Sequence, residues 1–226
     1  MALTSSTSAR ARKSSAGARR SEAKVPARES AAKDAAVEAR ERAIKEAALR
    51  CIRRHGVRKV AVEDIAIAAG VSRRTFYRFY TGRRALMEAI VLDRLRVLAE
   101  GVKAVIRECD DFESRVVRGS VETMRLARAD KIYHDIVGED NTLMFDENPG
   151  SPDGPREVLS TSIWADVFER AREEGVLRPT ITNHEAQEWL IDAHRLLVMR
   201  EDLSEDEQAD RLRRFVLPAF MTTPPA

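Results

Sequence analysis

The sequence predicts an all-α fold in which an N-terminal three-helix unit precedes a larger C-terminal helical domain. Apolar residues recur at spacings of three and four along most of the chain after residue 35, as on one face of a helix. Capping-box spacings mark three helix starts, at Asp110 with Glu113, Thr182 with Glu185 and Ser204 with Glu207. We find no segment with the alternation of apolar and polar residues that is typical of a strand.

The first 34 residues consist mainly of Ser, Ala and Arg and contain almost nothing that can build a core. We therefore predict a disordered basic tail over residues 1–34. A mitochondrial transit peptide has a similar Arg and Ser content. Glu22, Glu29 and Asp34 argue against one here, as does the lack of an apolar face.

Residues 35–82 are predicted to form the three-helix unit. The first helix has apolar residues at helical spacing from Ile44 to Ile52 and ends at Gly56, which is typical of a position just after a helix. Two short helices are expected over 62–69 and 72–79, with Ser72 as the N-cap of the second. The segment "AAGV" between them supplies a glycine for a tight turn.

Residues 83–226 are predicted to form the second domain. A long helix is expected over 83–108, with a kink or a close packing contact at Gly101. Further helices are expected near 111–129, 131–138, 155–174, 183–201 and 204–217, with Pro155 in a first helical turn and Gly175 after a helix end. The composition of residues 146–155 favours a mobile loop.

The charge is distributed unevenly. Residues 1–100 contain 23 Lys and Arg against 11 Asp and Glu, whereas residues 101–226 contain 16 against 26, so the formal net charge of +2 hides two opposite halves. The basic half suits a polyanion such as nucleic acid or an anionic membrane surface. No run of about 18 apolar residues is present that would span a membrane. Two distant cysteines are consistent with a reducing cytoplasm.

Motifs for catalysis or metal binding are not found. The sequence lacks a nucleophile elbow, a P-loop and a dinucleotide-binding glycine pattern, so we expect neither an enzyme nor a cofactor. Cys51 and His55 have a ligand-like spacing but no second pair, and a packed thiol beside a helix-terminal histidine explains them better. No metal site is predicted.

Two short helices joined by a glycine turn and preceded by a longer helix indicate a helix-turn-helix unit, whose second helix enters the major groove of DNA. Its exposed residues are expected to be Arg73, Arg74, Thr75 and Tyr77, which suit guanine edges, thymine methyls and phosphates. Arginine pairs also follow two helix starts, at Arg73 and at Arg83. Cations there oppose the helix dipole unless an anion such as phosphate lies in front of them.

The segment "VEDIAIAAGVSRRTFYRFYTGRRALMEAI", residues 62–90, resembles the DNA-binding domain of the TetR family of transcriptional repressors. About 45 residues, from Arg42 to Leu86, follow the helix, turn and core positions of that family. The resemblance implies that Arg73, Arg74, Thr75 and Tyr77 contact bases or phosphate, and that Arg83, with Arg84 as a second candidate, contacts phosphate. Ala61 departs from the family, which commonly has a capping Thr at that position.

The resemblance also implies a ligand pocket and a dimer interface in the second domain. Candidate pocket residues, which are equally what a helical core requires, are Val105, Val117, Met124, Ile136, Phe145, Ile163, Trp164 and Val167. The last two helices are apolar on more than one side, and in the family such helices pair into a four-helix interface. The candidate interface residues are Trp189, Leu190, Ala193, Leu197, Leu212, Phe215 and Val216.

Together these features predict a cytoplasmic homodimeric regulator, most simply a repressor, that binds a palindromic operator in double-stranded DNA and is released by a small hydrophobic ligand. A helical sensor or interaction protein whose basic face binds RNA or an anionic membrane is the alternative. Sequence preference in DNA binding separates the two hypotheses.

Overall fold

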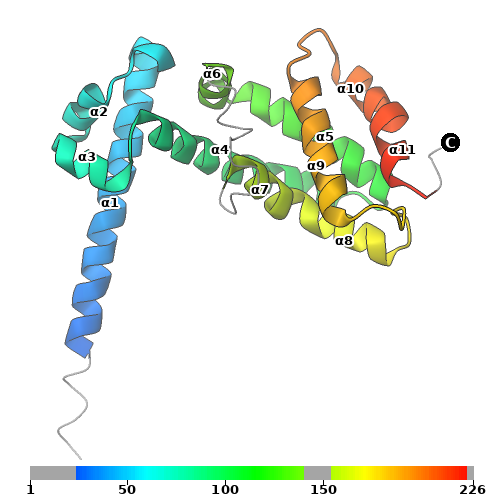
Figure 1. Cartoon of the computed structure of the whole chain (residues 1–226), viewed down its shortest axis with the longest axis horizontal. Coiled ribbons are helices and arrows are strands. Elements are labelled where there is room, and N and C mark those ends of the chain that lie inside the picture. The colour runs from blue at the N-terminus through cyan, green and yellow to red at the C-terminus, as the bar shows by residue number, and fades with distance from the viewer. Residues whose placement is uncertain (1–23, 140–153, 223–226) are drawn as a thin grey trace, which may run out of the picture. The chain divides into compact units, whose positions relative to one another are not determined.

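The computed structural model describes residues 24–139 and 154–222, and all regular secondary structure in these ranges is helical (Figure 1). A single isolated bridge between Leu177 and Met221 is the exception to helix among them. The all-α class is confirmed. The chain divides into two compact units, Met1–Ala43 and Ile44–Ala226, which are described separately.

Helix α1 spans Lys24–His55 and thus begins before the boundary predicted at residue 34. The tail predicted over residues 1–34 thus overlaps this helix at residues 24–34, whereas residues 1–23 lie outside the described ranges. This stretch is rich in Ala, Arg, Glu and Lys, which have high intrinsic helix propensity. It has no apolar stripe, and residues 30–40 are exposed, so the periodicity on which the prediction depended is absent.

The helix-turn-helix region follows the predicted ranges closely. After the short 3-10 turn η1, Val57–Lys59, helices α2 and α3 span Val62–Ala69 and Arg73–Phe79. Gly70 ends α2 in a left-handed conformation with φ 67°, which a side chain would strain, and the Ser72 hydroxyl accepts a hydrogen bond from the Thr75 amide at 3.1 Å. Ile44, Ile52, Ile65, Phe76 and Leu86 form the buried core of this region.

The remaining helices form a bundle (Figure 1). Their bounds are α4 Arg83–Arg107, α5 Phe112–Ala129, α6 Lys131–Glu139, α7 Pro155–Leu159, η3 Ser160–Trp164, α8 Ala165–Glu173, α9 Asn183–Val198, α10 Glu205–Arg211, η4 Leu212–Val216 and α11 Leu217–Phe220. The capping boxes at Thr182 and Ser204 are confirmed, whereas the one expected at Asp110 is wrong, because Asp111 is the N-cap of α5 and its side chain accepts the Ser114 amide. The helix expected over 155–174 contains one π-helical segment, η3, and the last helix contains another, η4, and continues to Phe220.

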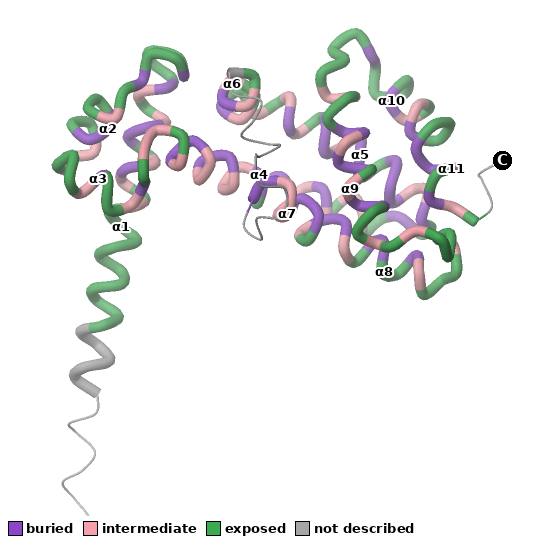
Figure 2. The backbone as a smooth tube through the Cα atoms, viewed as in Figure 1, coloured by how far each residue is buried: buried purple, intermediate pink, exposed green. Residues whose placement is uncertain are grey.

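Helix α4 connects the helix-turn-helix region to the bundle, where it packs against α5, α6 and α7 (Figure 1). Buried positions follow its inner side along most of its length (Figure 2). A Cβ atom on Gly101 would lie 2.8 Å from Leu126 Cδ1, so the predicted close contact at this glycine is confirmed. A Cβ on Gly119 would lie 3.0 Å from the ring of Trp164, so α5 must present a glycine where this indole packs.

The helix-turn-helix region and the bundle lie in the same compact unit, so the predicted division at residue 82 is not a boundary between compact units. Helix α6 of the bundle packs on η1, and contacts of this kind join the two parts. No helix among the described residues is long and apolar enough to cross a membrane.

Candidate nucleic-acid interface and ligand cavity

Helix α3 presents a polar outer face over an apolar inner one. Phe76 is fully buried, whereas Arg73, Arg74 and Tyr77 are exposed and Thr75 is half-buried. The Phe76 and Tyr77 rings meet edge to face, with 5.6 Å between their centroids, which holds the tyrosine at the edge of the core. The four predicted recognition residues therefore lie together on one short helix, and three of them face solvent.

Arg73 has a partner that the sequence did not indicate. Its Nη2 lies 2.9 Å from the Glu63 carboxylate of α2, and both side chains are largely exposed. An exposed pair of this kind contributes little to stability, so the guanidinium can exchange it for a base edge at small cost. At the start of α2 the Asp64 carboxylate accepts the Ala61 amide at 3.3 Å, which is the half of a capping box that does not require a Thr hydroxyl.

The two arginines at the start of α4 differ. Arg84 is exposed, whereas Arg83 is half-buried and its Nη2 donates to the Val57 carbonyl oxygen at 2.6 Å. Arg83 thus joins the first turn of α4 to η1, a role that no local sequence pattern indicated. Phosphate contacts by Arg83 and Arg84 remain predictions, and for Arg83 they would use its other N–H groups.

A cavity of about 180 Å³ lies in the bundle, enclosed by α4, α5, α6, α7 and α9. Most of its wall is aliphatic, and its main apolar lining residues are Leu95, Leu98, Met124, Leu159, Ile191 and Val198. Thr123, Tyr133 and His194 add polar groups. Burial raises the pKa of Tyr133 above its ordinary value, so its hydroxyl stays protonated.

Of the eight predicted pocket residues, Met124 lines this cavity. Phe145 lies outside the described residues. The other six predicted residues do not line this cavity, since five of these side chains are buried in the core and Val105 is half-buried, and their place in a ligand site stays a prediction: Val105, Val117, Ile136, Ile163, Trp164 and Val167. Apolar periodicity finds buried positions but does not separate those that border a void from those that fill the core.

His194 is the cavity residue with the most unusual environment. It is 6% exposed, and neither Nδ1 nor Nε2 has a hydrogen-bond partner among the described residues. Burial lowers the pKa of His194 to about 3, so the imidazole is neutral at physiological pH. The Trp164 ring packs on it with 5.4 Å between centroids. The sequence analysis missed this residue, since a single histidine on an apolar helix face gives no distinct signal.

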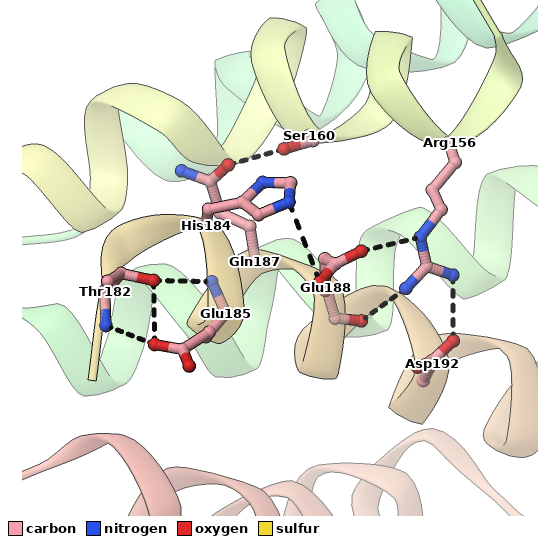
Figure 3. Close-up of polar contacts among 8 residues, drawn as sticks. All are labelled: Arg156, Ser160, Thr182, His184, Glu185, Gln187, Glu188 and Asp192. Carbon is pink, nitrogen blue, oxygen red and sulfur yellow. Dashed lines mark hydrogen bonds and ion pairs between the residues drawn. The ribbon is translucent and has the colours of Figure 1, made fainter. Parts of the chain in front are cut away.

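A polar clamp, made of Arg156, Ser160, Gln187, Glu188 and Asp192, joins α7 and η3 to α9 (Figure 3). Arg156 Nη1 donates to the Asp192 carboxylate at 2.9 Å, and its Nη2 donates to the Glu188 carbonyl at 3.2 Å. The Ser160 hydroxyl donates to the Gln187 side-chain oxygen, and both residues are buried. These contacts fix one wall of the cavity.

The side of the cavity formed by α4 and α6 is connected to the helix-turn-helix region. Lys45 of α1 pairs with Asp93 of α4 at 2.8 Å, and Leu95 and Leu98, two and five residues after Asp93, line the cavity. Arg94 of α4 pairs at 3.4 Å with Asp130, whose carboxylate also accepts the Tyr133 amide at the start of α6. Since α6 packs on η1, both α4 and α6 touch the cavity at one place and the DNA-binding region at another.

The candidate dimer residues separate into two groups. Trp189 and Phe215 are 48% and 65% exposed and are available to a partner, and Leu197 is half-buried. The other four are buried within their own chain, where their side chains fill its core, and their part in an interface stays a prediction: Leu190, Ala193, Leu212 and Val216. Leu196 and Met199 are also exposed, at the end of α9 and just after it. Helices α9 and α10 both pack on α5, so their outer faces are the surfaces to consider.

Metal and thiol chemistry have no support in the described ranges. No group of three or more His, Cys, Asp or Glu residues there is arranged to hold a metal ion. Cys51 and Cys109 are free thiols, and Cys109 donates to the Val105 carbonyl oxygen at 3.3 Å as a packed residue.

Comparison with known structures shows the same fold in several regulators. Thermus thermophilus FadR, a TetR family transcriptional repressor in complex with lauroyl-CoA, is 22% identical with a TM-score of 0.62, and the match covers 82% of this chain and 97% of that one. A TetR family transcription regulator from Marinobacter aquaeolei VT8 is 17% identical, with a TM-score of 0.52 and coverage of 81% and 96%. The ketosteroid transcriptional regulator KstR2 of Mycobacterium tuberculosis is 16% identical, with a TM-score of 0.50 and coverage of 81% and 96%.

The sequence comparison locates the similarity in the DNA-binding region. No curated protein sequence matches the chain. The family described as bacterial regulatory proteins, tetR family, matches residues 44–90, which contain the core of the helix-turn-helix region, the recognition helix and the start of α4. Residues 44–90 therefore match the DNA-binding domain of the tetR family of bacterial regulatory proteins, and about four-fifths of the chain has the fold of TetR family regulators.

Proposed function

We propose that this protein is a ligand-responsive repressor that binds a palindromic operator as a homodimer in the cytoplasm and is released by a small hydrophobic ligand. The observation that carries the proposal is the largely aliphatic cavity, because two of its walls, α4 and α6, also contact the helix-turn-helix region. A DNA-binding module alone does not require such a cavity.

The proposed mechanism is a shift between two arrangements of α4 and α6. A ligand that fits the cavity better in one arrangement displaces the equilibrium toward it. The movement reaches the recognition helix through the Lys45–Asp93 pair and through the Arg83 contact with Val57. A ligand that prefers the released arrangement about 100-fold changes operator binding by at most about 2.7 kcal/mol per site.

Two of the structural neighbours support an apolar ligand. Thermus thermophilus FadR is in complex with lauroyl-CoA, and KstR2 is a ketosteroid transcriptional regulator. The lauroyl chain and the ketosteroid skeleton are largely apolar, as is the wall of the cavity here. We infer the class of ligand from this and not its identity.

The operator hypothesis predicts a strong sequence preference. Genomic fragments selected by the purified protein should share a palindrome, with half-sites about one helical turn, roughly 34 to 36 Å, apart. Specific binding should exceed binding to random DNA by at least about 10³-fold at physiological salt. Equal affinity for all fragments at each salt concentration would overturn the proposal in favour of a nonspecific polyanion-binding protein. Ligand release is measured on the selected operator with small apolar molecules that fit a cavity of about 180 Å³ as first probes.

The homodimer is expected to depend on the exposed apolar residues of α9 and η4. Phe215→Glu places a charge on a side chain that is 65% exposed in the single chain, so the fold should tolerate it while association fails. Operator affinity should then fall, since one helix-turn-helix region reads one half-site. Sedimentation and operator binding measure the two effects.

The matched control for the dimer is Val97→Glu. Val97 is 73% exposed on α4 and therefore also an exposed apolar residue, but it lies outside α9 and η4. We expect this variant to sediment like the unmodified protein. If both variants dissociate, or neither does, the dimer face lies elsewhere.

A further inference from the structure

We propose that His194 is the polar anchor of the ligand site, and that the cavity takes a compact, uncharged, mostly apolar molecule bearing one hydroxyl or carbonyl oxygen. The inference rests on the proposed ligand-responsive function and specifies the chemistry of that ligand. Its basis is a buried imidazole that lines the cavity with both ring nitrogens unpaired.

Unpaired buried nitrogens are the first argument. A buried polar group that lacks a hydrogen bond is destabilising, and native proteins keep few of them. The neighbouring polar group on the cavity wall does not relieve His194, because the Thr123 hydroxyl donates to the Gly119 carbonyl oxygen at 2.8 Å within α5. Both nitrogens are themselves buried in this structure, so a ligand oxygen in the cavity supplies the missing partner after a small turn of the imidazole. The Trp164 ring packs on the imidazole with 5.4 Å between the ring centroids.

The second argument concerns charge. A neutral imidazole offers one N–H donor and one nitrogen acceptor, which match a hydroxyl or a carbonyl oxygen. A carboxylate inserted among the aliphatic side chains would lose its hydration and find no buried cation on this wall, since Arg195, which also lines the cavity, is exposed. His134 and Glu201, 3.9 Å apart, are likewise exposed lining residues. The deep part of the site therefore favours an uncharged oxygen.

The third argument concerns size. An apolar cavity of about 150 Å³ in another protein holds benzene. The volume of about 180 Å³ here consequently suits a single ring or a short branched chain with roughly one or two further heavy atoms. The common requirement is one neutral oxygen on a small apolar body, and the hydroxyl and carbonyl cases are separated by experiment.

The test uses four small probes with the full-length protein. p-Cresol carries the hydroxyl, acetophenone carries the carbonyl, p-xylene is the matched hydrocarbon and 4-methylbenzoate is the matched anion. We expect p-cresol, acetophenone or both to bind roughly three- to tenfold more tightly than p-xylene, as one net hydrogen bond implies. The nitrogen-15 resonances of the His194 ring should shift with the oxygen-bearing probe and remain unchanged with p-xylene.

Variants test whether the preference for oxygen-bearing probes depends on the His194 side chain. His194→Phe should bind p-xylene at least as well as the unmodified protein and lose the preference for oxygen, which also shows that the cavity persists. His194→Asn should keep part of the preference. His184→Phe is the matched control, because His184 is an exposed histidine on α9 whose Nε2 lies 3.7 Å from Glu188, and it should change nothing (Figure 3).

Four results would overturn the anchor: no binding of any probe, equal binding of p-cresol, acetophenone and p-xylene, tightest binding of 4-methylbenzoate, or an unchanged preference in His194→Phe. Operator binding measured on the same samples separates this inference from the proposed function. Probe binding that depends on His194 but leaves the operator complex intact would contradict the proposed release by ligand, and would not contradict the anchor. Operator release by a larger ligand without a role for His194 would contradict the anchor only.

Discussion

Replacing Arg73 and Arg74 together with alanine is expected to lower the ratio of operator affinity to random-DNA affinity by roughly 30-fold to 10⁴-fold. A good bidentate contact between arginine and a guanine edge gives about 1–3 kcal/mol of discrimination, and this helix presents two exposed arginines in its first turn. The fold should persist, because neither side chain is buried and the Arg73–Glu63 pair is exposed. Competition binding against random DNA at several salt concentrations measures the ratio.

Arg84→Ala is the matched control for this double variant. Arg84 is an exposed arginine in the first turn of α4, where we predict a phosphate contact. Its loss should weaken operator and random DNA alike and reduce the salt dependence by about one phosphate contact. An unchanged affinity ratio after removal of Arg73 and Arg74 would show that α3 does not read bases through these side chains.

Replacing Arg128 with methionine is expected to lower stability by about 2–4 kcal/mol and the Tm by roughly 5–15 °C. The Arg128 guanidinium, from α5, donates to three carbonyl oxygens near the end of α9: Leu197 at 2.9 Å, Arg200 at 3.0 Å and Val198 at 3.2 Å. Leu197 and Val198 stand in the last turn of α9, where carbonyl oxygens lack the usual donor four residues on, and a cation at a helix C-terminus is favoured by the dipole. The Leu197 and Arg200 oxygens each also accept one backbone amide, from Arg200 and Leu203. Methionine keeps the apolar stem and removes all three bonds, and thermal unfolding measures the loss.

Arg125→Met provides the comparison on the same helix. Arg125 is exposed and pairs at 2.7 Å with Glu122, which lies on its own helix. Exposed pairs of this kind are screened by solvent, so its Tm shift should be much smaller than that of the Arg128 variant. If the two variants have the same Tm, the end of α9 is held by its packing and not by Arg128.

The sequence predicts most helices well where local chemistry determines them. Ser72, Thr182 and Ser204 act as caps at the predicted positions because a hydroxyl pairs with an amide three residues away, which depends only on nearby residues. The π-helical segments at Ser160–Trp164 and Leu212–Val216 were not predicted, since they depend on how the helix packs against distant elements. The early start of α1 was missed because propensity without amphipathic periodicity gives a weak signal.

The candidate sites also divide into features that nearby residues determine and features that depend on distant elements. The recognition residues share one turn of a short helix, so their placement can be deduced from spacing alone. The ligand cavity is enclosed by five helices far apart in sequence, and a residue such as His194 becomes distinctive only when burial removes its partners. Arg83 and Arg128 also have structural roles that depend on carbonyl groups of remote segments. Such roles require the folded arrangement and leave no local pattern.

The polar clamp makes the side of the cavity formed by α7, η3 and α9 stiffer than the side formed by α4 and α6. Arg156 and the Ser160–Gln187 pair lock α7 and η3 onto α9 through directional bonds, whereas α4 and α6 meet the cavity mainly through apolar side chains. Apolar contacts resist sliding less than buried hydrogen bonds do, so an entering molecule works against a stiff side and a soft side. We therefore expect an entering molecule to displace α4 and α6, which lead to the DNA-binding region, more than α7 and α9.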